Sequence, residues 1–360
     1  MNIKAFKYLS PLIIYVLAII SFTNTGWQCW LAMMYAWIFI PLIELFLLPD
    51  TSNMESAEEE LAKKDKLYDY ILYLIVFLQV PTLFFFLFSM RDIGLSNADI
   101  IGRIFTMGLL CGTFGINVAH ELGHRTNLFE QTLAKISLLT SLYMHFFIEH
   151  NKGHHKNVAT PEDPSSAPFG QSVYAFWIRT VSGTYKSAWH ISNEEAKKKN
   201  HVVISLRNEM FLFQIIQLLF VGLIYLLFGW KITLYFLAAA TIGFLLLETV
   251  NYIEHYGLRR KEIDMGRFER ALPQHSWNSD HVIGRLMLFE LSRHSDHHYL
   301  ASRKYQILRH HEDAPQMPTG YPGMMLLSLC PPAWFYIMHK QMKKFSLLPE
   351  TKSTLHVQSA

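Results

Sequence analysis

Nine histidines in this sequence fall into four short motifs whose residue types and spacing suit metal binding. The motifs read HELGH at 120–124, EHNKGHH at 149–155, NYIEHYG at 251–257 and RHSDHH at 293–298. Their histidines are His120, His124, His150, His154, His155, His255, His294, His297 and His298. Imidazole is a ligand of zinc, copper, iron and nickel, so metal chemistry is the first function that the sequence indicates.

The spacing within the motifs predicts how these histidines share metal ions. Residues three or four apart lie on one face of a helix, so two histidines at that spacing can hold one ion. Three pairs have this spacing: His120/His124, His150/His154 and His294/His298. Neighbouring residues on a helix point about 100° apart, so each neighbouring pair is expected to divide between two metal centres. Two such pairs occur: His154–His155 and His297–His298.

The number of histidines favours two ions with four or five ligands each. HELGH also fits the HExxH motif of zinc hydrolases, in which Glu121 would be the catalytic base. A zinc site of that kind needs only three protein ligands and would leave six histidines unused, and zinc is redox-inert. Iron in pairs, used for dioxygen chemistry, explains more of the sequence.

The composition indicates a membrane protein and excludes several other classes. Of the 360 residues, 51% are hydrophobic and 17% are charged, whereas soluble domains carry about 25% charged residues. The three cysteines form no CxxC pair, which excludes a disulfide framework and a cysteine-held metal. The net charge of +3 gives nucleic-acid binding no support.

The histidine motifs lie among apolar segments long enough to cross a bilayer, which takes about 20 residues. We predict an all-α integral membrane protein with six transmembrane helices in three hairpins, at about 8–22, 27–48, 69–90, 100–120, 210–228 and 232–252. Basic residues concentrate in the long segments between hairpins, so the positive-inside rule places both termini and these segments in the cytosol. The cytosolic segments, 121–209 and 253–345, then carry the histidine-rich region. Residues 1–345 form one domain, and 346–360 form a flexible tail.

Two further apolar stretches are interpreted as helices on the cytosolic side. Residues 133–148 lie between two histidine motifs, which a membrane crossing would place on opposite faces. Residues 324–338 contain Pro331 and Pro332, and proline interrupts a helix.

Taken together, the motifs resemble those of the membrane-bound alkane monooxygenases, within the wider family of integral-membrane desaturases and hydroxylases. The matching stretches are HELGHR (120–125), HFFIEHNKGHH (145–155), NYIEHYGL (251–258) and RHSDHH (293–298). The resemblance implies a non-haem di-iron enzyme whose ligands are the nine histidines above. Its reaction would insert one oxygen atom from O2 into the terminal methyl group of a medium or long alkane, giving a primary alcohol.

The resemblance also implies partners and a location. Electrons would come from a separate rubredoxin, reduced by an NADH-dependent rubredoxin reductase, and the alkane would enter from the bilayer. The location would be a bacterial inner membrane, with the active site on the cytosolic side.

Other residues are assigned supporting roles. Acids beside the ligands can accept the second N–H of an imidazole; Asp296 is the first choice, followed by Glu121 and Glu254, with Glu149 and Asp163 as further candidates. In this family, bulk in the second span limits the length of the substrate, which makes Trp37 the candidate gate of a substrate channel.

Alternative functions remain open at this point. The nearest is a related hydroxylase that acts on fatty-acyl ω-carbons or on xylene-like methyl groups, followed by a desaturase. A membrane metal transporter belongs to a different class and predicts ionisable residues in mid-span. Only Glu44 and Glu248 approach that description, each near the end of its segment.

Overall fold

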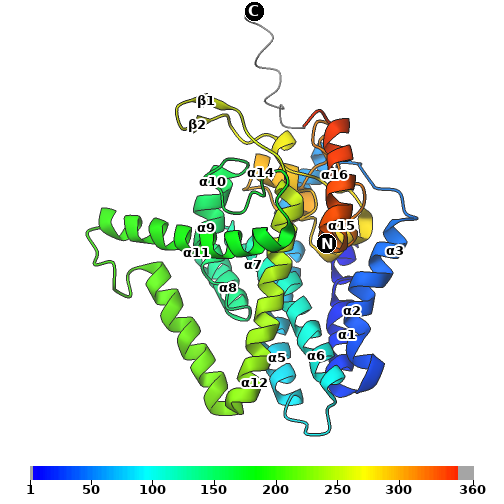
Figure 1. Cartoon of the computed structure of the whole chain (residues 1–360), viewed down its shortest axis with the longest axis vertical. Helices are drawn as coiled ribbons and strands as arrows, with labels where there is room; N and C mark the ends of the chain where they lie inside the picture. Colours follow the sequence, from blue (N-terminus) through cyan, green and yellow to red (C-terminus); the bar gives the residue numbers. More distant parts are fainter. Residues whose placement is uncertain (1–2, 348–360) are drawn as a thin grey trace, which may run out of the picture.

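The computed structural model describes residues 3–347, which are mostly helical (Figure 1). Most of the predicted tail at 346–360 lies outside the described residues. The first half of the chain forms η1 (Ile3–Leu9), α1 (Leu12–Thr23), η2 (Gly26–Trp30), α2 (Leu31–Met34), η3 (Tyr35–Phe39), α3 (Ile40–Glu44), α4 (Ser56–Lys64), α5 (Leu67–Ser89), α6 (Asn97–Leu110), η4 (Cys111–Ile116), α7 (Asn117–Gly123), α8 (Leu128–Leu139), α9 (Phe146–Glu149), η5 (His150–His154) and α10 (His155–Asn157). The second half forms α11 (Val173–Lys198), α12 (Glu209–His255), β1 (Glu262–Asp264), β2 (Arg267–Phe268), η6 (Pro273–His275), α13 (Val282–Met287), α14 (His294–Tyr299), η7 (Tyr305–Ile307), α15 (Tyr321–Ser328) and α16 (Pro331–Lys344).

Five helical stretches among the described residues are long and apolar enough to cross a membrane: Lys4–Thr23, Gly26–Glu44, Leu67–Ser89, Asn97–Gly123 and Glu209–His255. The first four correspond to the first four predicted spans. A helix hides its backbone polar groups within itself, which makes it suited to a lipid environment.

The fifth stretch, α12, is where the structure differs from the prediction of six separate spans. It has 47 residues, and Gly229 within it has a non-helical backbone with φ 79° and ψ 172°. Figure 1 shows the chain running down one arm of α12 and returning along the other, so that the arms form a V. The predicted segments 210–228 and 232–252 are therefore the two arms of one element, joined at a glycine rather than by a loop.

Small residues let the return arm of α12 approach the helix that leads to the HELGH motif. A Cβ added at Gly243 would lie 2.5 Å from the Cβ of Cys111, and one added at Gly112 would lie 3.0 Å from the carbonyl oxygen of Gly243. Such close approach through small residues is common between membrane helices. It holds η4, which leads into α7 and His120, against the arm of α12 that ends at His255.

The remaining helices cover one end of this bundle. The 26-residue α11 lies across the bundle (Figure 1). The stretch predicted as a helix at 133–148 forms α8 and α9, and α8 has only 12 residues, too few to cross a bilayer. Pro331 begins α16 three residues after α15 ends, so the proline pair does separate two helices.

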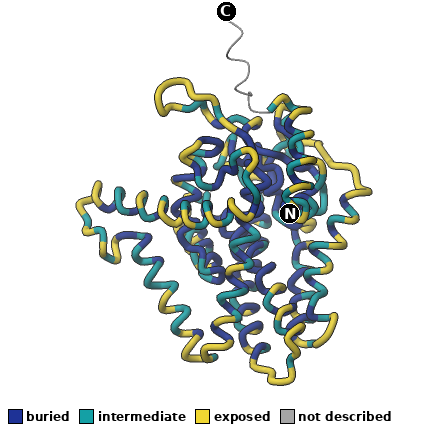
Figure 2. Tube along the Cα trace, in the orientation of Figure 1, coloured by how far each residue is buried: buried dark blue, intermediate teal, exposed yellow. Residues whose placement is uncertain are grey.

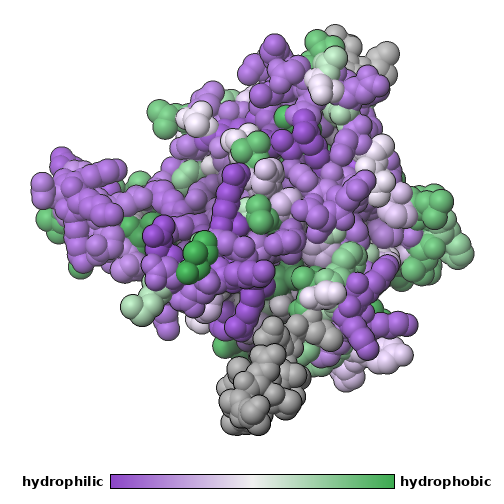
Figure 3. Space-filling model, turned by 90° about the horizontal axis from the view of Figure 1, so that it is seen from above, coloured by the Kyte–Doolittle hydropathy of each residue, from purple (hydrophilic) through white to green (hydrophobic). Residues whose placement is uncertain are grey.

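The two ends of the molecule differ in exposure and polarity. Figure 2 shows buried residues concentrated at the centre of the bundle and beneath the covering helices, with exposed residues on the outer faces. Seen from the end that carries α14 and α16, the surface is mostly hydrophilic, with hydrophobic residues mainly near the rim (Figure 3). The histidine motifs lie beneath this hydrophilic end.

The backbone at Gly229 yields a testable prediction. Its φ and ψ values lie in a region that is essentially restricted to glycine, so Gly229→Ala should lower the free energy of unfolding by about 1–3 kcal/mol. Gly222, on the same arm of α12, has nothing within 4 Å of an added Cβ, so Gly222→Ala should be neutral or slightly stabilising. Thermal unfolding in detergent measures both, and equal effects of the two substitutions would contradict this account of the break.

Candidate metal centre

All nine histidines singled out by the sequence converge on one buried region. Their ligand atoms fall into two sets, each with all its atoms within 4.8 Å of one another. The five-histidine group contains His120, His124, His150, His155 and His297. The four-histidine group contains His154, His255, His294 and His298. Each set could hold a metal ion.

The nitrogens that face one another are mostly Nε2 atoms at short distances. In the five-histidine group, Nε2 of His120 lies 3.0 Å from Nε2 of His297 and 3.2 Å from Nε2 of His124. In the four-histidine group, the Nε2 atoms of His255 and His294 are 3.1 Å apart. A neutral imidazole has one acceptor nitrogen and one donor nitrogen, so several Nε2 atoms directed at one point suit a cation better than a hydrogen-bond network.

The two groups are neighbours. The rings of His155 and His298, which belong to different groups, have centroids 4.6 Å apart, and those of His297 and His298 are 5.4 Å apart. Both neighbouring pairs in the sequence, His154–His155 and His297–His298, divide between the groups as predicted.

One predicted pair is wrong. His150 shares its group with His155 rather than with His154, and the Nε2 atoms of His150 and His155 are 3.0 Å apart. The reason is local: η5 is a π-helix, in which hydrogen bonds link residues five apart rather than four. The wider turn brings His150 over His155 and directs His154 to the other group.

Burial keeps most of these imidazoles neutral, which metal binding requires. Burial, reinforced by the neighbouring imidazoles, lowers the pKa of His150 and His297 well below the usual value. It lowers the pKa of His155 to about 3. Burial also acts to lower the pKa of His154, but the adjacent Asp163 carboxylate outweighs it and the pKa is raised.

Asp163 is the carboxylate that orients a candidate ligand. Its Oδ2 lies 2.9 Å from Nδ1 of His154, so the Nδ1–H group donates to the carboxylate and Nε2 is the ring nitrogen that faces the group. Ser166 donates to the same oxygen at 2.6 Å, and the backbone N–H of Ser165 donates to Oδ1. Carboxylates in this position fix the tautomer and the ring orientation of metal-bound histidines.

Asp296, our first choice from the sequence, does not have this role. It lies two residues after His294 in α14, about 200° around the helix, and therefore on the face opposite the ligands. Its carboxylate instead accepts hydrogen bonds from Arg303, from the backbone N–H of Arg309, and from Nε2 of His311 at 2.7 Å.

The two remaining acids chosen from the sequence differ from each other. Glu121 accepts hydrogen bonds from Arg125 and from the backbone N–H of Tyr305, so its contacts lie outside both histidine groups. Glu254 accepts a hydrogen bond from Tyr321 at 2.8 Å, and its other oxygen is 3.2 Å from Nε2 of His294. Glu254 is thus at the edge of the four-histidine group, on the side where the ligand nitrogens converge.

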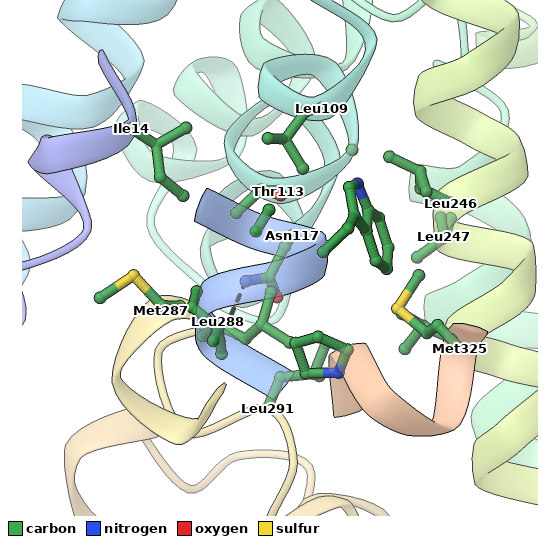
Figure 4. A pocket seen from close by; sticks show the side chains of 16 residues that line it. Ile14, Leu109, Thr113, Asn117, Leu246, Leu247, Met287, Leu288, Leu291 and Met325 are labelled. Carbon is green, nitrogen blue, oxygen red and sulfur yellow. Dashed lines mark hydrogen bonds between the residues drawn. The ribbon is translucent and has the colours of Figure 1, made fainter. Parts of the chain in front are cut away.

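Figure 4 shows the lining of an apolar cavity formed in part by residues that precede the candidate ligands along the chain. Its lining comes from the segments that lead into the ligand helices: Asn117 precedes His120 by three residues, Leu291 precedes His294 by three, and Val250 precedes His255 by five. A second apolar cavity adjoins it, and three residues line both: Trp37, Leu246 and Met325. The sequence singled out Trp37 but missed Asn117, although Asn117 is a polar residue one turn before a ligand in an otherwise apolar segment.

Three π-helical segments lie around this region. They are η3, which contains Trp37, η4, which lines the cavity through Gly112 and Thr113, and η5 with its histidines. π-Helical turns within α-helices are frequent at functional sites. Fold and site together define a mainly helical protein with membrane-length apolar helices and a buried cluster of histidines that could hold metal.

Comparison with known proteins agrees with that class. The family model of the fatty acid desaturases matches residues 100–328. Alkane 1-monooxygenase 1 of Alcanivorax borkumensis is 35% identical over 87% of this chain and 78% of its own length. Alkane 1-monooxygenase 2 of Pseudomonas aeruginosa is 37% identical over 88% of this chain and 84% of its own length. A more distant relative is the xylene/toluene monooxygenase hydroxylase component of Pseudomonas putida. It is 28% identical over 73% of this chain and 72% of its own length. The chain belongs to the alkane 1-monooxygenases, within the fatty acid desaturase family.

The contact between Asp163 and His154 predicts an effect on metal binding. Asp163→Asn should weaken the affinity of the four-histidine group about 10–100-fold, as loss of such an orienting carboxylate typically does. The measurement is a titration of metal-free protein with ferrous iron. Asp296→Asn is the matched control, because Asp296 contacts none of the nine imidazoles, and an equal loss in both variants would count against this role of Asp163.

Proposed function

We propose that this protein hydroxylates the terminal methyl group of medium- and long-chain n-alkanes. The reaction is R–CH3 + O2 + 2 e− + 2 H+ → R–CH2OH + H2O. The observation that carries the proposal is the convergence of nine imidazoles into two neighbouring groups beside an apolar cavity. The names of the relatives, alkane 1-monooxygenases, give the reaction class.

Two iron ions fit the residues better than zinc does. Five imidazoles exceed the four ligands of a tetrahedral zinc site. The five-histidine group would hold one iron and the four-histidine group the other. Glu121, which a zinc hydrolase would use as base, is held by Arg125 and Tyr305. When bound, the irons supply the dioxygen activation that an unactivated C–H bond requires.

The protein's own residues orient the candidate ligands, hold the alkyl chain and exclude water from the site. Asp163 holds His154 in the tautomer that a ligand needs. The cavity, lined by aliphatic side chains and Trp37, receives an alkyl chain and keeps water away from the reacting end. Because the cavity is lined by the turns before His120 and His294, a chain that fills it presents its end to the histidine groups.

The proposed topology has six spans in three hairpins, with each arm of α12 crossing once. The glycine break at 229 and the opposite directions of the arms support it. The hydrophilic end with the histidine helices then faces the cytosol, together with both termini, and the membrane is a bacterial inner membrane. One domain, residues 1–345, includes the cytosolic segments 121–209 and 253–345.

The proposed electron donor is a separate rubredoxin, reduced by an NADH-dependent rubredoxin reductase. Within the two groups, His124 and His155 are the half-buried members and the others are buried. Electrons therefore have their shortest route from the surface through the five-histidine group.

A second candidate reaction is the hydroxylation of xylene-like methyl groups, favoured by the xylene/toluene relative. Fatty-acyl ω-carbons, or desaturation, would use the same type of metal site. The product tells these reactions apart.

The proposal predicts a labelled product. Purified protein with rubredoxin, its reductase, NADH and octane under 18O2 should give octan-1-ol that carries 18O, detected by mass spectrometry. His297→Ala removes a member of the five-histidine group and should abolish the product, whereas His190→Ala, at an exposed position of α11, should not. Octene as product would instead identify a desaturase, and turnover of p-xylene but not octane would identify the second candidate.

The position of Trp37 yields a prediction about the longest alkane that the protein accepts. Because Trp37 lines both apolar cavities, Trp37→Ser should join them and let the protein hydroxylate longer alkanes than the wild type does. Product profiles over a series of n-alkanes measure this. Trp30→Ser is the control, since Trp30 lines neither cavity, and an unchanged length limit in Trp37→Ser would remove Trp37 as the gate.

A further inference from the structure

The cavity beside the histidine groups contains two polar side chains that an alkane does not need. Apart from the Trp37 indole, the lining is aliphatic or backbone except for Thr113 and Asn117. These residues lie four apart, and His120 follows Asn117 by three. Both side chains line the same cavity, and Asn117 lies one helical turn before His120 in α7.

The orientation of the Asn117 amide is determined by one hydrogen bond. Its Nδ2 donates to the carbonyl oxygen of Leu288 at 2.9 Å (Figure 4). A carbonyl only accepts hydrogen bonds, so the atom that contacts it is the amide nitrogen. The Oδ1 atom is thereby directed away from Leu288, and no donor to it is found among residues 3–347.

A free acceptor in an apolar cavity carries a free-energy cost. Asn117 is only 5% exposed, and its Oδ1 is not among the fully buried polar atoms that lack a partner, so this oxygen keeps accessible surface that a ligand in the cavity can reach. An n-alkane has no donor for Oδ1, whereas the primary alcohol that replaces it has one O–H group, formed at the end of the chain nearest the histidines. The acceptor therefore matches the product rather than the substrate.

We propose that Oδ1 of Asn117 is a binding subsite for the hydroxyl group of the primary alcohol product. The alcohol donates its O–H to Oδ1, one helical turn from His120, with its alkyl chain in the cavity. This subsite makes the protein bind primary alcohols more tightly than it binds chains of equal length with no donor. Asn117 rather than Thr113 has this role because it is the nearer of the two to His120 along the chain. The inference rests on the proposed function for the identity of the ligand.

The test compares two ligands on the purified, metal-loaded protein in lipid nanodiscs. Dissociation constants are measured for octan-1-ol and for 1-fluorooctane, which has the same length but no O–H, with protein-free nanodiscs correcting for partition into lipid. The wild type should bind the alcohol about tenfold more tightly, the value of one good hydrogen bond. In Asn117→Leu the ratio of the dissociation constant of 1-fluorooctane to that of octan-1-ol should fall to about one, while the dissociation constant of 1-fluorooctane stays the same.

Thr113→Val is the matched control and should keep the wild-type ratio. Equal binding of the two ligands to the wild type, or an unchanged ratio in Asn117→Leu, would overturn the proposal. Loss of the ratio in Thr113→Val but not in Asn117→Leu would overturn the assignment to Asn117.

A second measurement covers the case in which Asn117→Leu fails to fold after losing its bond to Leu288. The wild type is then tested with methyl octyl ether, which keeps the oxygen but has no hydrogen to donate. Weaker binding of the ether than of the alcohol supports the subsite, and equal binding overturns it. These experiments need no turnover, so a failure to form octan-1-ol from octane would refute the proposed function separately.

Discussion

The structure of this protein depends on the close approach of nine imidazoles whose acceptor nitrogens face one another. They come from separate segments of the chain, from α7 to α14, and most are buried and neutral. Nitrogens directed at a common point cannot all satisfy one another, because each neutral ring offers only one donor. A bound cation removes this conflict, and since ligand sites rarely exist in an unfolded chain, metal binding also stabilises the fold.

The membrane-length helices provide the frame that brings these segments together. The return arm of α12, which ends at His255, packs closely against η4, which leads to His120, through Gly243 and Gly112. The same helices enclose the apolar cavity beside the histidines. One helix thus serves both requirements of the proposed reaction, since α7 carries the candidate ligand His120 and, one turn earlier, lines the apolar cavity through Asn117.

The sequence predicted the features that follow from regular periodicity. The first four spans, the nine histidines and the division of neighbouring histidines between two groups all follow from hydropathy and helical spacing. The π-helical turn at His150, which changes its partner from His154 to His155, and the glycine break at 229 depend on local backbone geometry that a helical repeat does not encode. Asp163 rather than Asp296 contacts a candidate ligand because the fold returns a loop to His154, and only tertiary structure shows that contact.

The measurement that tests the central claim most directly is the metal content of the purified protein and of variants in one group. The account predicts about two irons per chain in the wild type. It predicts about one iron when both His255 and His294 are replaced by alanine, because the five-histidine group is left intact. One zinc ion per chain in the wild type, or an iron content that the double variant leaves unchanged, would contradict the assignment of two separate histidine-bound irons.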